Sequence, residues 1–163
     1  MKWRNQHREK AGVRKWSNTG LFFAVLILPA ILSGSVHAQA VNVEIQGVAA
    51  SDPGKKDQNV APSLGRFKDV LKDTVFGTFK DAGSAKVKPA TGGKDSATIA
   101  GYGVDVALIK TWGKKAKVEV TIKHGGKPIG QPISTALTQG EPIMISQLGA
   151  KDAPTILIFT YRE

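Results

Sequence analysis

The sequence of 163 residues contains no cysteine, three histidines and three tryptophans. The absence of cysteine excludes disulfide bonds, so the fold must be stabilised by apolar burial and backbone hydrogen bonding. A structural zinc site is disfavoured as well, because cysteine is absent and histidine is scarce, and these two residues are its usual ligands. Three further motifs are absent from the sequence: the spaced aspartates of a calcium-binding loop, the P-loop and the dinucleotide-binding fingerprint.

The first forty residues have the three parts of a secretion signal. Residues 1–20 carry six basic residues and one acid, and a short apolar run follows at 21–32, broken by Pro29. Small residues then lead to Ala38-Gln39-Ala40. We predict cleavage after Ala38 or after Ala40, and export to the periplasm or the cell exterior. The alternative is an uncleaved membrane anchor, which is disfavoured because a bilayer span needs about 20 apolar residues.

Removal of residues 1–40 leaves 41–163 as one domain, long enough for a modest core. The domain keeps 17 basic and 12 acidic residues, a net charge of +5, with no long block of one sign. It also keeps a single imidazole, His124, and a single indole, Trp112. Little reactive chemistry therefore remains, and no membrane span is expected after cleavage.

Alternating apolar residues predict strands over much of this domain. Residues 41–46 and 117–123 alternate with a period of two, and 155–161 is a nearly continuous apolar run that is typical of a central strand buried on both faces. A further strand is expected at 98–110, and a polar loop at 51–61. Gly125-Gly126 favours a hairpin turn. The prolines that follow favour an edge strand or an irregular start at 128–138.

One amphipathic helix is expected at about 62–75, near the N-terminus of the mature domain. Pro62 suits a first helical position, and apolar residues recur from Leu64 to Val75 at spacings of three and four. The expected fold class is therefore mainly β (α+β): an antiparallel sheet or sandwich of about six or seven strands with one helix.

Catalytic and metal sites find little support in the sequence. His124 could act with Ser134 or Ser146, but no nucleophile elbow surrounds either serine. Asp105 and Glu119 could form a hydrolytic carboxylate pair, although each alternates with apolar residues and is expected to face solvent. Asp52, Asp57, Asp69 and Asp73 are close in sequence and are candidates for a calcium site, but Asp69 and Asp73 are better explained as the solvent face of the helix. We predict no catalytic residue, cofactor or metal.

Basic residues around one tryptophan give the only candidate binding surface. A lysine-rich face with aromatic residues is suited to polyanions such as acidic polysaccharide, lipid head groups or nucleic acid. The alternative is that these lysines confer solubility and protect sheet edges. The candidate residues are Lys110, Trp112, Lys114, Lys115, Lys117, Lys123 and Lys127.

From Phe76 onward the chain resembles small exported bacterial β-rich proteins of unassigned function. The similar pieces run F-G-T-F, I-A-G-Y, K-V-E-V-T-I-K, G-K-P-I-G-Q-P-I, G-E-P-I-M-I and A-P-T-I-L-I-F-T. The resemblance covers most of the domain and implies a bacterial secreted β-rich protein. It transfers no catalytic residue and no ligand.

Three functions remain open at this point. The leading hypothesis is a non-enzymatic domain of the periplasm or exterior, a binding or structural component of the envelope. The second is a polyanion-binding module that uses the lysine-rich face, and the third is a small carboxylate-based hydrolase. The partner is undetermined by the sequence, with another envelope protein or an anionic polymer as the candidates.

Overall fold

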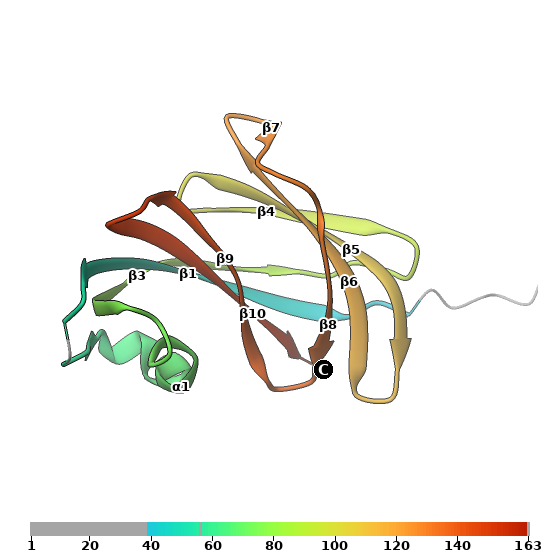
Figure 1. Cartoon of the computed structure of the whole chain (residues 1–163). Coiled ribbons are helices and arrows are strands. Elements are labelled where there is room, and N and C mark those ends of the chain that lie inside the picture. Colours follow the sequence, from blue (N-terminus) through green and yellow to red (C-terminus); the bar gives the residue numbers. More distant parts are fainter. Residues whose placement is uncertain (1–38, 56, 163) are drawn as a thin grey trace, which may run out of the picture. The chain divides into compact units, whose positions relative to one another are not determined.

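Two β-sheets packed face to face form the domain in the computed structural model, which describes residues 39–55 and 57–162 (Figure 1). The first sheet has the order β2-β3-β1-β10-β9, and the second has the order β4-β5-β6-β7 with β8 also paired to β6. All pairings are antiparallel except that of β2 with β3. The predicted mainly-β class is therefore confirmed. The strands are β1 (Asn42–Pro53), β2 (Asn59–Val60), β3 (Phe76–Val87), β4 (Lys94–Ile99), β5 (Tyr102–Trp112), β6 (Lys115–His124), β7 (Lys127–Pro128), β8 (Ile133–Thr138), β9 (Pro142–Ala150) and β10 (Ala153–Arg162).

The main core lies between the sheets and follows from the alternation seen in the sequence. Every second residue of β6, from Ala116 to Ile122, is buried, while the residues between them face outward. Ile45 of β1 and Phe159 of β10 are directly opposite each other in the first sheet and belong to the same core cluster. Each sheet thus buries one face against the other, as in a β-sandwich.

Strand β10 lies at the centre of the first sheet, between β1 and β9, and is buried on both faces as predicted. Leu157 and Phe159 join the core between the sheets. Ile156 and Ile158 point to the opposite side and join a second, smaller cluster. This second face of the first sheet is covered by the helical segment.

The helical segment is shorter than predicted and is not N-terminal. A 3₁₀ helix, η1 (Pro62–Phe67), passes into α1 (Lys68–Leu71), and both follow β1 and β2. The end predicted at about residue 75 was wrong, because the backbone N–H and the hydroxyl of Thr74 both donate to the Leu71 carbonyl and close the last turn. Pro62 does occupy a first helical position, whereas Val75, expected in the core, is 68% exposed.

The number of strands exceeds the predicted six or seven for two reasons. The structure contains two strands of only two residues, β2 and β7, that carry no recognisable alternation. A turn at Ala100–Gly101 also divides the predicted strand at 98–110 between β4 and β5. The loop expected at 51–61 contains the end of β1 and all of β2.

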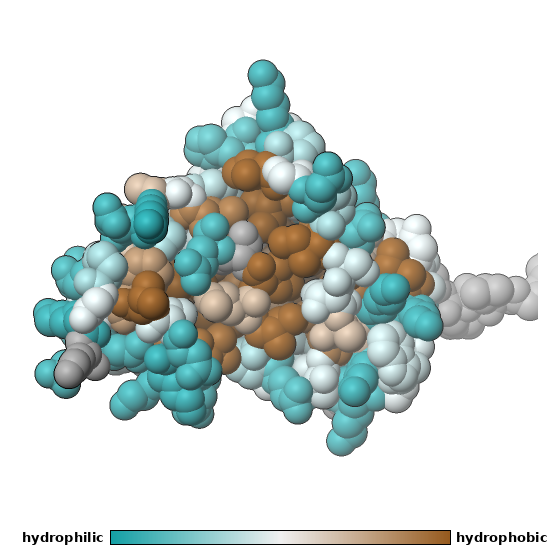
Figure 2. Space-filling view, viewed as in Figure 1, coloured by the Kyte–Doolittle hydropathy of each residue, from teal (hydrophilic) through white to brown (hydrophobic). Residues whose placement is uncertain are grey.

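The sandwich has an open side where β8 and β9 are the edge strands of their sheets. The hairpin turn at Gly125–Gly126 is confirmed, and β7 and β8 lie at a sheet edge as the prolines predicted. Figure 2 shows hydrophobic side chains gathered over and between these edges. Ile133 and Ile143 are half-buried there, and Met144 is 37% exposed.

The predicted leader falls almost wholly outside the described residues, which begin at Gln39. Within residues 39–55 and 57–162, no helix has the length and apolar character needed to cross a bilayer.

Candidate functional site

Four lysines and Trp112 gather at one end of the second sheet, on the face turned away from the core. We name this group the basic tip; it consists of Lys110, Trp112, Lys114, Lys115 and Lys117. In the register of β5 and β6, Lys110 lies opposite Lys117 and Trp112 lies opposite Lys115. Because Lys115 and Lys117 alternate with buried residues, the pairs on this part of β5 face outward with them.

A β-bulge in β5 creates this arrangement. The register shifts between Leu108 and Lys110, so that Ile109 is the extra residue. Leu108 is buried, and a regular strand would have turned Lys110 and Trp112 inward with it. The bulge reverses the alternation and re-aims both side chains into solvent, which is a recognised role of bulges near binding sites.

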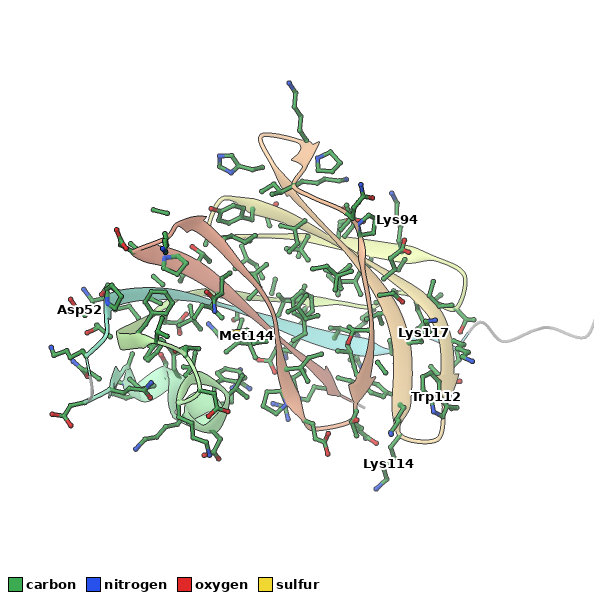
Figure 3. The ribbon with its side chains drawn as sticks, viewed as in Figure 1. Asp52, Lys94, Trp112, Lys114, Lys117 and Met144 are labelled. Carbon is green, nitrogen blue, oxygen red and sulfur yellow. The ribbon has the colours of Figure 1, made fainter. Side chains whose placement is uncertain are left out.

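The turn between the two strands holds the tip together. Gly113 has φ of +54°, a conformation that side-chain-bearing residues adopt poorly, and Lys114 follows it. The Lys114 carbonyl accepts a hydrogen bond from the Gln139 backbone, which fixes the turn to the end of β8. The Lys110 ammonium lies 5.3 Å from the Trp112 ring centroid, within cation–π range. Figure 3 shows Trp112, Lys114 and Lys117 at this end of β5 and β6.

The lysines of the basic tip are not offset by ion pairs with described residues, and the acid next to them on the same face of β6 is Glu119, two residues from Lys117. Among the residues that the structure describes, none of the four forms an ion pair with a carboxylate. Trp112 is 43% exposed, so the indole is accessible beside them. The tip is therefore an open, positively charged surface with one aromatic ring.

Lys123, which the sequence grouped with these residues, lies at the other end of the same face. It is six residues from Lys117 along β6, about 20 Å at the usual strand rise. Its ammonium is 2.7 Å from the Asp105 carboxylate, which also pairs with Lys94 at 3.8 Å. The pKa of Asp105 is lowered, foremost by the hydrogen bond from Lys123. Lys123 is thus already paired with an acid, which it shares with Lys94.

Lys127 is also outside the basic tip. It lies on β7, opposite His124, beyond the hairpin turn at the far end of the second sheet. The ring of His124 lies 5.2 Å from that of Tyr102, at an interplanar angle of 42°. The predicted basic surface therefore divides into the tip and two separate lysines.

The serine and histidine arrangement is not assembled. Ser134 lies opposite Glu119, five residues along β6 from His124, which places the two about 17 Å apart. Ser146 belongs to β9 in the other sheet. Neither Ser134 nor Ser146 therefore lies beside His124 in the second sheet.

Asp105 and Glu119 do lie on neighbouring strands and face away from the core, as predicted. Asp105 is opposite Thr121 and Glu119 is opposite Ala107, which makes the carboxylates diagonal neighbours. A general acid for glycoside hydrolysis needs a raised pKa, whereas that of Asp105 is lowered by Lys123. Asp105 is therefore the acidic partner of a salt bridge with Lys123 and does not have the raised pKa of a general acid.

Two of the four aspartates considered for calcium have other partners. Asp69 pairs with Lys72 at 3.3 Å on the helical segment, and Asp52 accepts a hydrogen bond from the Thr78 hydroxyl. Figure 3 shows Asp52 at the end of β1, far along the molecule from Trp112. Across 39–55 and 57–162, no cluster of three or more potential ligand residues could hold a metal ion.

A second charged site was missed by the sequence reasoning. It is a hollow of about 450 Å³ on the helix-covered side of the first sheet, and we name it the arginine pocket. Its charged residues come from four elements, β1, η1, β3 and β10, and from Lys88 just beyond the end of β3. The lining residues are Asn42, Val43, Glu44, Arg66, Lys86, Lys88 and Arg162.

Glu44 organises the arginine pocket. It lies opposite Lys86 on β3 and opposite Thr160 on β10, and its side chain is only 13% exposed. The two Nη groups of Arg66 donate to its two carboxylate oxygens at 2.5 and 3.1 Å, and Nε of Arg162 donates at 3.3 Å. The pKa of Glu44 is lowered, foremost by the Arg66 hydrogen bond, against an opposing effect of burial.

The surroundings of the pocket fix the Arg66 side chain further. Its guanidinium carbon lies 4.5 Å from the ring centroid of Phe67, which is buried in the second core cluster. Thr160 is buried beside Glu44, and its hydroxyl has no hydrogen-bond partner among the described residues. Glu44, Arg66 and Arg162 are far apart in sequence from one another and from Lys86 and Lys88, so no local pattern could have grouped them.

Comparisons with known proteins add no assignment. No protein-family model, no curated protein and no solved structure matches the chain.

Proposed function

We propose that this protein is a non-enzymatic binding domain that works outside the cytoplasm and binds an acidic polysaccharide of the cell envelope through its basic tip. The observation that carries the proposal is the unpaired set of four lysines around the exposed ring of Trp112. The proposal joins the export predicted from the sequence with a surface that the fold has assembled.

The form of the basic tip suits a polymer. Its residues lie on an open sheet face, so a long chain can cross the face without entering a cavity. Lysines supply cations for carboxylate or sulfate groups, and an indole supplies a flat apolar surface beside them. Residues of this kind on one surface are a common basis for polyanion binding.

Edge protection accounts less well for these lysines. Lys115 and Lys117 lie on β6, where they pair with β5 on one side and with β8 on the other. Lysines that protect a sheet against aggregation are useful on edge strands, where backbone groups are unpaired. A binding role explains cations at this interior position of the sheet.

Export favours polysaccharide over nucleic acid as the ligand, because acidic polysaccharides are constituents of cell envelopes. The hydrogen bonds of Gln39 support cleavage after Ala38, the first of the two predicted sites. The Gln39 carbonyl accepts from the backbone and the hydroxyl of Thr91, and its side-chain oxygen accepts from Thr111 at 2.6 Å. Cleavage after Ala40 would remove all three bonds.

Trp112 provides a direct test, because it is the only tryptophan after residue 38. Heparin and polygalacturonate would be titrated into the protein recovered after export, with Trp112 fluorescence as the signal. We expect saturable binding that weakens about tenfold or more when salt is raised from about 50 to 200 mM. The double variant Lys110→Gln/Lys117→Gln should bind at least about tenfold more weakly.

The matched control removes two charges elsewhere. Lys127 and Lys151 are exposed and form no ion pair with described residues. Lys127→Gln/Lys151→Gln should therefore bind within about twofold of the natural protein. The proposal would be contradicted if both double variants lost the same amount of affinity, or if the affinity did not change with salt concentration. Tighter binding of duplex DNA than of either polysaccharide would assign the tip to nucleic acid instead.

A further inference from the structure

We infer that the arginine pocket is a binding site for a phosphate or sulfate group, separate from the basic tip. The inference goes beyond the proposed polysaccharide surface, because it concerns a hollow on the other sheet and a compact anion. It rests on the size of the hollow, its charge and the way in which Glu44 holds the two arginines.

The hollow is large enough for an anionic group with part of the molecule that carries it. Its volume of about 450 Å³ lies within the range of small-molecule sites, about 300 to 1,000 Å³. Asn42 and Val43 contribute to its wall beside the charged residues. The site is thus a concave feature, in contrast to the open face at Trp112.

Positive charge exceeds negative charge in the pocket. Among the lining residues, Arg66, Lys86, Lys88 and Arg162 accompany a single carboxylate, that of Glu44. Outside the lining, Asp81 interacts electrostatically with Arg66, and Asp95 accepts the backbone N–H of Lys88. Both arginines share the Glu44 carboxylate, and neither lysine forms an ion pair with a described residue. Cations brought together with so little compensation repel one another, and a bound anion relieves that repulsion. The excess favours a dianion over a single carboxylate.

The arginines are held in place before any ligand binds. Arg66 is fixed by two hydrogen bonds to Glu44 and by its contact with the Phe67 ring. Arg162 uses only Nε toward Glu44, and its two Nη groups form no hydrogen bond with described residues. These Nη groups remain as donors for an anion. Guanidinium forks match the oxygens of phosphate and sulfate, and an ordered fork loses less entropy on binding.

The lysines complete the set of donors. Lys86 lies in β3 and Lys88 lies just beyond the end of that strand. Both residues line the hollow. The backbone N–H of Lys88 donates to Asp95 at 2.7 Å, which anchors this part of the chain. Two guanidinium groups and two ammonium groups around one hollow supply donors for several oxygens of a tetrahedral anion.

The test is a titration of the exported protein with inorganic phosphate and, separately, with sulfate. Binding is monitored through the backbone amide chemical shifts in NMR spectra. Sodium chloride of equal ionic strength serves as the reference. We expect saturable shifts centred on Glu44, Lys86 and Arg162. The double variant Arg162→Gln/Lys86→Gln should bind at least about tenfold more weakly, and an unchanged spectrum elsewhere shows that it is folded.

Lys80→Gln is the matched control, because Lys80 is an exposed lysine of β3 outside the pocket. It should bind phosphate within about twofold of the natural protein. Binding of inorganic phosphate that strengthens as pH rises through the second ionisation of phosphate identifies the dianion as the bound form. Similar affinity for sulfate shows that the site accepts either tetrahedral dianion.

The inference is overturned if neither ion produces saturable shifts beyond those of chloride, or if the double variant binds as tightly as Lys80→Gln. The basic-tip variant Lys110→Gln/Lys117→Gln should leave phosphate binding unchanged. The outcome for the pocket is therefore independent of the outcome for the polysaccharide surface.

Discussion

The basic tip and the arginine pocket concentrate the same sign of charge in two different ways. At the tip, lysines lie on an open sheet face around Trp112 and have no acidic partner among the described residues. In the pocket, Glu44 ties Arg66 and Arg162 together within a hollow. The first arrangement leaves long, mobile side chains for an extended ligand, while the second orders planar groups for a compact one.

This difference has a consequence for stability as well as for binding. Charges that only repel one another should weaken the fold slightly, whereas a carboxylate that accepts three hydrogen bonds should strengthen it. Removing charge is therefore expected to have opposite effects in the two regions. The predictions below test the contrast, starting with the larger effect.

Glu44→Gln should lower the free energy of unfolding by about 1 kcal/mol at neutral pH, since it weakens the bonds from Arg66 and Arg162. The estimate is modest because both arginines remain partly exposed to water. The pKa of Glu44 is lowered in the folded protein from its usual 4.5. Its contribution is therefore fully present above about pH 5, and it is lost as pH falls through the folded value.

Urea denaturation at neutral pH and at about pH 3 measures both parts of this prediction. The stability difference between Glu44→Gln and the natural protein should shrink at the lower pH. Glu119→Gln is the matched control, because Glu119 forms no ion pair with a described residue. A Glu44→Gln protein as stable as the control at neutral pH would show that the pocket is not held by this carboxylate.

Lys117→Gln should have a smaller effect of opposite sign. Lys117 lies directly opposite Lys110, and like charges in that position destabilise a sheet by a few tenths of a kcal/mol. We expect the free energy of unfolding to rise by about 0.3 kcal/mol at low salt, with the gain disappearing at high salt. A loss of more than about 1 kcal/mol would mean that Lys117 is retained for stability, which would remove the contrast.

The sequence predicted those parts of the fold that depend on local alternation. The strands at 41–46 and 117–123, the hairpin at Gly125–Gly126 and the doubly buried β10 were all predicted correctly, because each has its own pattern of apolar residues or glycines. The helix was predicted too long. Its apolar spacing continued to Val75, whereas Thr74 ends the segment by bonding back to Leu71.

The candidate site was predicted only in part, because the sequence shows local groupings and does not show which strands lie side by side. Lysines of the basic tip are close in sequence and were grouped together, although the inclusion of Lys123 ignored the length of β6 and its pairing with Asp105. The outward position of Lys110 depends on a bulge that alternation alone would have missed. The pocket joins β1, η1, β3 and β10, and only the tertiary structure brings Glu44 and its arginines together.

Export is the premise on which the binding proposal depends, and the N-terminus of the natural protein tests it most directly. Mass spectrometry of the protein isolated from the cell envelope should find a chain that begins at Gln39, because Gln39 is hydrogen-bonded to Thr91 and Thr111. A protein found in the cytoplasm with Met1 and its six basic leader residues still attached would contradict the account.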